Sequence, residues 1–160
     1  MSYIIRHADE NDVPGIMKLI RELAAFEKEP EAVINTEENL LNDGFGKHPV
    51  YKALVAEMAD TGEVVGMALY FVMYSTWKGR VLYLDDLMVT ERYRNNGIGR
   101  RLMDEFLKEA QQMGVHQVRW HVLDWNTPAV EFYKTLGADF EPQWVTVKMD
   151  SAQMKNYLDK

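Results

Sequence analysis

The chain has 160 residues and a formal net charge of −7 at pH 7, and it contains no cysteine. This length is typical of a single domain that buries its own core. The lack of cysteine excludes a disulfide framework, a thiolate metal site and a cysteine nucleophile. The acidic balance argues against a broad surface for nucleic acid or membranes and suits a cationic partner. No apolar run approaches the roughly 20 residues that span a bilayer, and the start of the chain has no secretory apolar stretch. We therefore expect one cytoplasmic domain over residues 1–160.

In chain order, the hydrophobic pattern predicts a strand, two helices, three strands and then alternating helices and strands. The predicted strands cover residues 2–6, 51–57, 63–74, 80–89, 116–123 and 144–150. The predicted helices run from Asp12 to about Glu27, from Thr36 to about Gly44, from about Gly97 to Gly114, from Asn126 to Gly137, and over 151–158. The order β-α-α-β-β-β-α-β-α-β, with a short helix after it, predicts an α/β (α+β) layered domain.

An arginine-rich stretch, RYRNNGIGRR at residues 92–101, separates the predicted strand that ends at Val89 from the helix that begins near Gly97. Unpaired amides and the positive end of the dipole make a helix N-terminus a good phosphate site. Gly97 and Gly99 would let a bulky anion approach the backbone, and the arginines would add charge-assisted contacts. The stretch therefore predicts a cradle for a diphosphate.

Two other phosphate motifs fit this stretch poorly. A dinucleotide-binding loop would carry a third glycine where Leu102 stands, and it normally follows the first strand. A P-loop would continue with Gly-Lys-Ser or Gly-Lys-Thr, which the chain lacks. A plain packing role for Gly-x-Gly at a helix start stays open at this point.

The pattern Arg94-x-x-Gly97-x-Gly99 after a hydrophobic strand resembles the acetyl-coenzyme A signature of the GCN5-related N-acetyltransferases, the GNAT family. Longer stretches are similar to the diamine acetyltransferase branch of that family; they read IRELAAFEK, DGFGKHPVYKALVAE, STWKGRVLYLDD and VLDWNTPAVEFYKTLGA. The resemblance covers roughly residues 4 to 149. It implies the GNAT fold, with a mixed central sheet flanked by helices, acetyl-coenzyme A as cosubstrate, and a homodimer.

The resemblance also implies which residues bind the coenzyme. The backbone of the strand before the loop would hold the pantetheine arm, the loop amides would hold the pyrophosphate, and the start of a later helix would make a second contact. The expected coenzyme-binding residues are Leu87, Met88, Val89, Arg94, Asn95, Asn96, Gly97, Ile98, Gly99, Arg100, Asn126, Thr127, Pro128, Ala129 and Tyr133.

Two residues match catalytic positions of the family. Tyr133 aligns with the tyrosine that gives a proton to the leaving thiolate. Asp85 stands where diamine acetyltransferases commonly carry a glutamate that binds the substrate amine and takes its proton, and the shorter side chain favours a bridging water. Asp86 would point to the other face of an ideal strand, so we expect a structural or outer role for it.

The expected substrate side combines the end of the first long helix with the strand near residue 120. Besides Asp85, the matching residues are Phe26, Glu27, Arg119, Trp120 and His121. His7, His48 and His116 show no metal-ligand spacing, so we expect no metal.

These matches imply an enzyme that moves an acetyl group from acetyl-coenzyme A to a primary amine, by direct attack in a ternary complex. Thialysine or a lysine-like amine ranks first among small cationic substrates. Diamines and polyamines such as spermidine and spermine rank second. Thr135 and Leu136 stand where polyamine-specific relatives carry a basic pair, and Pro142 falls near their late glutamate. A non-catalytic coenzyme A-binding module and a protein acetyltransferase are further alternatives.

Overall fold

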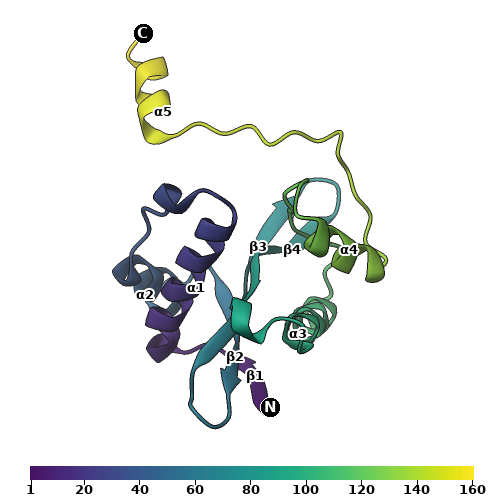
Figure 1. The fold of residues 1–160 in the computed structure, drawn as a ribbon. Coiled ribbons are helices and arrows are strands. Elements are labelled where there is room, and N and C mark those ends of the chain that lie inside the picture. Colours follow the sequence, from purple (N-terminus) through teal and green to yellow (C-terminus); the bar gives the residue numbers. More distant parts are fainter. The chain divides into compact units, whose positions relative to one another are not determined.

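The computed structural model describes all residues from Met1 to Lys160. The chain forms two compact units, Met1–His121 and Val122–Lys160 (Figure 1). No helix combines the length and the apolar character needed to cross a membrane. The expectation that both units belong to one domain stays a prediction.

The first unit is built on a five-stranded sheet in which the strands follow one another in sequence order. The strands are β1 (Tyr3–His7), β2 (Lys52–Met58), β3 (Val64–Ser75), β4 (Gly79–Val89) and β5 (Val118–Arg119). All neighbours are antiparallel except β4 and β5, which are parallel. The three middle strands confirm the predicted meander, whose apolar and β-branched runs fill the buried positions.

Helices cover both faces of this sheet (Figure 1). One face carries α1 (Val13–Phe26) and α2 (Glu37–Phe45), and the other carries α3 (Ile98–Gln112). The core on the α1 face includes Ile16, Met17 and Leu19 of α1 with Met67, Leu69 and Met88 of the sheet. On the α3 face, the rings of Tyr70 and Phe106 lie 5.4 Å apart between centroids. These layers confirm the predicted mixed sheet flanked by helices.

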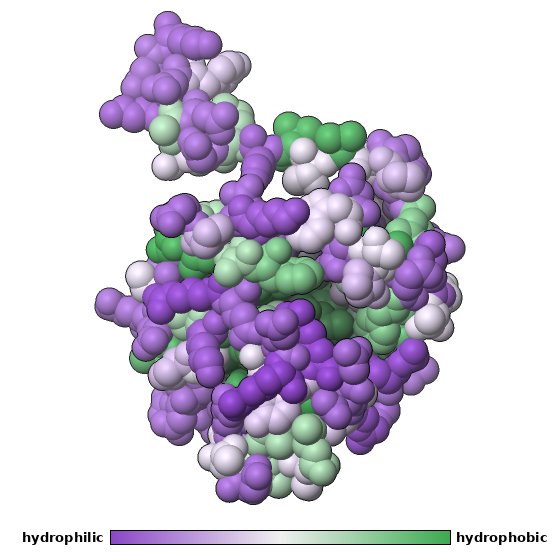
Figure 2. Space-filling view, viewed as in Figure 1, coloured by the Kyte–Doolittle hydropathy of each residue, from purple (hydrophilic) through white to green (hydrophobic).

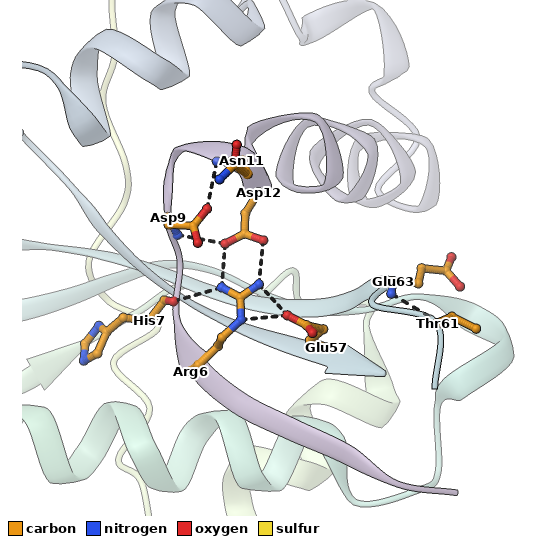
Figure 3. Close-up of polar contacts among 8 residues, drawn as sticks. All are labelled: Arg6, His7, Asp9, Asn11, Asp12, Glu57, Thr61 and Glu63. Carbon is orange, nitrogen blue, oxygen red and sulfur yellow. Dashed lines mark hydrogen bonds and ion pairs between the residues drawn. The ribbon is translucent and has the colours of Figure 1, made fainter. Parts of the chain in front are cut away.

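An ion-pair network fixes the start of α1 against the sheet (Figure 3). Arg6 of β1 donates to both carboxylate oxygens of buried Asp12, at 2.7 and 2.9 Å, and to Glu57 of β2 at 2.7 Å. The backbone amide of Asp9 also donates to Asp12, at 2.7 Å. Burial opposes ionisation of Asp12, but Arg6 and Asp9 outweigh it, so the pKa of Asp12 is lowered. The orientation of α1 is therefore set at its N-terminus, just after the 3-10 turn η1 (Glu10–Asp12).

A β-bulge interrupts the pairing of β3 with β4. Leu69 pairs with Asp86 and Tyr70 pairs with Leu84, so Asp85 is an extra residue with no partner in β3. Leu69 belongs to the core on the α1 face, so its partner Asp86 lies on that face too. The bulge therefore interrupts the regular alternation of faces at Asp85, on which the sequence-based placement of Asp85 and Asp86 depended. The ideal strand assumed in the sequence analysis does not form here, and the structural or outer role expected for Asp86 stays a prediction.

The second unit contains α4 (Thr127–Thr135) and α5 (Ser151–Leu158), joined by a long segment without regular structure. The prediction of a strand over residues 144–150 was wrong, because these residues form no strand. Trp144, Val145 and Val147 are 68, 81 and 89% exposed, and no strand pairs with them. The alternating pattern suits a sheet, but a strand forms only where a neighbour supplies its hydrogen bonds. The strand predicted over 116–123 is likewise reduced to β5, for the same reason.

The face of the protein in Figure 2 is mostly hydrophilic, with apolar side chains showing between the polar ones. This agrees with a composition in which 27% of the residues are charged.

Candidate active site

The chain leaves β4 at Val89 and turns twice before α3 begins. The first turn is the 3-10 helix η3 (Glu91–Tyr93), and the second passes through Asn95 and Gly97. Both of these residues have positive φ, 62° and 79°, in the left-handed region that disfavours residues with a Cβ atom. Gly97 is the N-cap residue of α3, which confirms the predicted strand-loop-helix setting and explains the first glycine.

The N-terminus of α3 has no side chain that caps it. By contrast, side chains of Thr36, Asn126 and Asp150 accept hydrogen bonds from the first turns of α2, α4 and α5. The first turn of α3 contains no acidic residue but carries Arg100 and Arg101. Positive side chains at the positive end of a helix dipole are unfavourable by themselves. The arrangement therefore suits a bound anion that interacts with the amides and the cations together.

Gly99 has no packing reason to be glycine. A Cβ atom there would meet only Val89, at an ordinary 3.7 Å, and the φ of Gly99 is not positive. What remains is access to the backbone from outside, which a ligand such as a pyrophosphate needs. The residues at the start of α3 thus fit the diphosphate group of coenzyme A.

Most of the arginines in this stretch have protein partners. Arg92 pairs with Glu63, and Arg101 lies 3.6 Å from Glu105. The Nε of Arg94 donates to the carbonyl oxygen of Val89 at 2.9 Å. The case for an anion site consequently depends more on the α3 amides than on the number of arginines.

Three carboxylates come together near the end of α1. Glu27 is the C-cap residue of α1, while Asp85 and Asp86 lie at the bulge in β4. Burial, together with the charges of Asp85 and Glu27, raises the pKa of Asp86 to about 7. Desolvation also raises the pKa of Glu27, and the charge of Asp85 raises it further. Desolvation raises the pKa of Asp85 as well, while the charge of His121 acts in the opposite direction. This group of acids can receive a cation and accept a proton near neutral pH.

Aromatic residues lie next to these acids on β4 and just after β5. The hydroxyl of Tyr83 is 2.5 Å from Nδ1 of His121, and the ring centroids of Tyr83 and Phe71 are 5.1 Å apart. Burial, followed by the charges of Asp85 and Asp86, raises the pKa of Tyr83. The structure thus brings predicted His121 to the acids and adds Tyr83, which the sequence reasoning missed. Its position two residues before Asp85 was the available signal.

The other predicted substrate-side residues are arranged differently. Arg119 donates from Nε to Gln117 at 2.6 Å and from a terminal nitrogen to Ser75 at 3.3 Å. Phe26 lies under the guanidinium of Arg94, whose Cζ is 5.2 Å from the ring centroid. Trp120 is partly buried beside His121 in the sequence. Their contact with a substrate stays a prediction.

In the second unit, Asn126 caps α4 by accepting from the amide of Ala129 at 3.4 Å. Pro128 lies in the first turn, where its missing N–H has no helical partner to lose. Tyr133 is 8% exposed, and its ring centroid is 5.4 Å from that of Phe132. Asn126 is therefore the N-cap of α4, whereas coenzyme binding by residues 126–129 and proton donation by Tyr133 stay predictions.

Known proteins resemble the chain over most of its length. The Acetyltransferase (GNAT) family matches residues 15–138. A thialysine N-epsilon-acetyltransferase from Bos taurus is 47% identical over 141 residues, which cover 84% of this chain and 83% of the relative. The spermidine/spermine N(1)-acetyltransferase-like protein 1 of Homo sapiens is 38% identical over 139 residues, 84% of this chain but 20% of that protein.

Solved structures agree on the fold. An integron cassette protein from the mobile metagenome of V. cholerae superimposes with a TM-score of 0.79 at 23% identity, covering 100% of this chain and 99% of its own. An aminoglycoside acetyltransferase from an uncultured soil metagenomic sample gives a TM-score of 0.76 at 22% identity, covering 92% and 95%.

The match over residues 15–138 shows that the chain is an acetyl-coenzyme A-dependent transferase, and the glycine N-cap of α3 without a capping side chain is consistent with that class. The chain belongs to the acetyltransferase (GNAT) family, and it is an enzyme that transfers the acetyl group of acetyl-coenzyme A to an amine.

Proposed function

We propose that this acetyltransferase acts on the primary amine of a small cationic metabolite, with thialysine or a lysine-like amino acid as the preferred acceptor. The observation that carries the proposal is the group of carboxylates formed by Glu27, Asp85 and Asp86. An ammonium group is complementary to such a group, and a cation there would offset the desolvation of the three carboxylates and the repulsion that adds to it at Glu27 and Asp86. The relatives named for thialysine support this choice of acceptor.

In this proposal, acetyl-coenzyme A lies along the end of β4 and the start of α3. The backbone of Leu87–Val89 holds the pantetheine arm, and the amides from Asn95 to Arg100 hold the pyrophosphate. The uncapped start of α3 and the accessible backbone at Gly99 support the second part. Residues 126–129 supply a further contact, as expected from the family resemblance.

The reaction requires three proton movements: two protons leave the substrate nitrogen, and one reaches the thiolate. The substrate arrives as an ammonium ion, and Asp85 takes one proton from it, directly or through a water. Asp86 is the next residue in β4 and is less exposed than Asp85. The free amine then attacks the carbonyl carbon of the thioester and a C–N bond forms. As the C–S bond breaks, the nitrogen gives up its second proton, which passes through solvent and restores the hydroxyl of Tyr133 after that residue has protonated the thiolate. The leaving thiolate takes a proton from Tyr133 and departs as coenzyme A.

Polyamines are the second candidate class of acceptor. The human relative named for spermidine and spermine, which is 38% identical, supports polyamines as an alternative class of acceptor. Thr135 and Leu136, together with Pro142, replace the basic pair and the glutamate expected of polyamine-specific relatives, and this supports the smaller acceptor.

We further propose that the protein is a cytoplasmic homodimer. The exposed apolar side chains of Trp144, Val145 and Val147 support an interface with a second copy, since they gain from burial. Sedimentation velocity measures the assembly directly, and a monomer over the whole concentration range would contradict this part.

A panel of amines assayed with acetyl-coenzyme A tests the proposal. We expect the highest kcat/KM for thialysine or another lysine-like amine, and a lower value for spermidine. A higher kcat/KM for spermidine than for every amino-acid amine would overturn the ranking. Failure to acetylate any small amine, with coenzyme A bound normally, would overturn the choice of substrate class.

A further inference from the structure

A side chain from α1 holds the segment that leads from β4 into the coenzyme loop. The carboxylate of Glu22 accepts from the hydroxyl of Thr90 at 3.0 and 2.8 Å, one distance to each oxygen. The backbone amide of Glu91 donates to the same carboxylate at 3.0 Å. Glu22 is partly buried and lies 68 residues away from Thr90 in the sequence. These hydrogen bonds connect two elements that the chain connectivity leaves independent.

Glu22 binds the start of η3, where the side chain of the N-cap threonine itself makes no capping hydrogen bond. Thr90 is the N-cap residue of η3, but its side chain makes no cap hydrogen bond. Its hydroxyl donates to Glu22 instead, and the amide of Glu91, the first residue of η3, is satisfied by Glu22 as well. The beginning of the coenzyme loop is therefore capped by α1 and not by its own sequence.

A second contact joins the same two regions one turn further along α1. The guanidinium of Arg94 lies over the ring of Phe26 while its Nε donates to Val89. Glu27 follows Phe26 directly, and its carboxylate interacts electrostatically with Asp85 and Asp86 of β4. One end of α1 thus contacts the coenzyme loop through Glu22 and Phe26, and reaches the amine-binding acids through Glu27.

We infer that Glu22 is a positioning residue that fixes the coenzyme loop against the C-terminal end of α1 and thereby couples coenzyme binding to amine binding. The inference rests on the proposed function, because it needs Glu27 and the acids of β4 to bind the amine. A loop that is held in place presents the amides of α3 in one geometry, and small displacements of such groups have large effects. When coenzyme A orders the loop, the same contacts order the end of α1, so each ligand favours the other.

The direction in which Glu22→Ala changes the affinity for coenzyme A distinguishes a positioning role of Glu22 from a purely electrostatic one. Removing a carboxylate near a site for a polyphosphate lowers the repulsion, so simple electrostatics predicts tighter binding of coenzyme A in Glu22→Ala. Loss of positioning predicts weaker binding. Loss of global stability alone would lower Tm and leave the affinity of the folded protein unchanged.

Calorimetry with coenzyme A, in the absence and presence of saturating amine, tests the inference. For the wild type we expect the Kd of coenzyme A to fall about fivefold when the amine is present, the low end of usual coupling. For Glu22→Ala we expect a Kd about fivefold higher than that of the wild type, and no change on adding amine. Glu31→Ala, which removes the same charge from an exposed residue of the 3-10 turn η2 (Pro30–Ala32), should behave like the wild type.

A second pair of variants keeps the test decisive if Glu22→Ala does not fold. Thr90→Val removes the hydroxyl at constant shape, and we expect it to lose about half of the coupling on a logarithmic scale. Thr90→Ser keeps the hydroxyl and should match the wild type. Wild-type affinity and coupling in both Glu22→Ala and Thr90→Val would overturn the inference and leave the proposed function intact. A wild type that does not bind coenzyme A would overturn the proposed function, and this inference with it.

Discussion

Two neighbouring parts of β4 suit ligand groups of opposite charge, and they do so by different physical means. At its end, β4 leads into α3, whose N-terminal amides suit the phosphates of coenzyme A. A few residues earlier, Asp85 and Asp86 join Glu27 to form the acidic part that suits an ammonium group. Backbone amides are fixed dipoles that do not titrate, whereas clustered carboxylates repel one another and do. Coenzyme binding should therefore depend little on pH near neutrality, while reaction with the amine should depend on it strongly.

The largest effect is expected at the coenzyme end. Gly99→Asp places a carboxylate beside the pyrophosphate and should weaken coenzyme A binding by about 10³-fold, because like charges are brought together. Calorimetry measures the loss. Gly99→Ala is the matched control, since its Cβ atom meets Val89 only at an ordinary distance, and it should bind far better. Unchanged binding by a folded Gly99→Asp protein would contradict the cradle.

The next effect concerns a residue outside both parts of β4. Tyr133→Phe keeps the buried ring but removes the hydroxyl, so turnover should fall by about 10²-fold, the usual scale for a lost general acid. The Kd of coenzyme A should change little. Turnover near the wild-type value would show that another donor protonates the thiolate, and Tyr133 would then be a core residue.

A smaller effect is expected for the charge at the amine end. Asp85→Asn preserves shape and should lower kcat/KM for the best amine by about 30-fold. This loss is smaller than is usual for removal of a general base, because Asp86 remains nearby. KM should rise and kcat should fall together. Coenzyme A affinity should stay at the wild-type value, which is what distinguishes the two parts of β4. A change confined to coenzyme affinity would reverse the assignment.

The smallest effect separates Asp86 from Asp85. Because the pKa of Asp86 is about 7, kcat/KM of the wild type should rise as pH increases through 7, and Asp86→Asn should remove this dependence. Stability should respond in the opposite sense. The folded pKa lies above the ordinary value of 3.8, so the folded state binds more protons than the unfolded state between these values, and wild-type stability falls as pH rises from 3.8 to about 7.

Thermal unfolding checks the second half of this prediction. At pH 8, Asp86→Asn should melt a few degrees above the wild type, and the difference should disappear near pH 4. Asp85→Asn serves as the comparison, because its more exposed carboxylate should change Tm less. Equal Tm values for the wild type and Asp86→Asn at pH 8 would show that the buried charge does not destabilise the fold.

The sequence predicted those parts of the fold that depend on local pattern. The long helices and the three-stranded meander appear within a few residues of their predicted bounds, because their apolar stripes are themselves long. The setting of Gly97 at a helix start was also predictable from local signals. The strand expected over 144–150 was not, because an extended segment needs a partner that its own residues do not specify.

The candidate site shows the same division. The types of residue at Asp85 and Tyr133 suggested chemistry, but the bulge at Asp85 depends on the register of β4 with β3, which no local pattern reveals. Glu22 was missed altogether, since its partner Thr90 is 68 residues away and a glutamate on a helix usually indicates a solvated face. The contacts that arrange this site are long-range, whereas the signals in the sequence are short-range.

The bulge at Asp85 also has a consequence for how this enzyme can diverge. Because Asp85 has no partner in β3, a chain without this residue would still pair Leu69 with Asp86 and Tyr70 with Leu84, now in an unbroken ladder. The residues that follow, up to Val89 and the start of α3, would keep their pairing. With the amine-binding role proposed for Asp85, loss or replacement of this one residue would alter the acceptor site while the strand that leads to the coenzyme loop keeps its pairing.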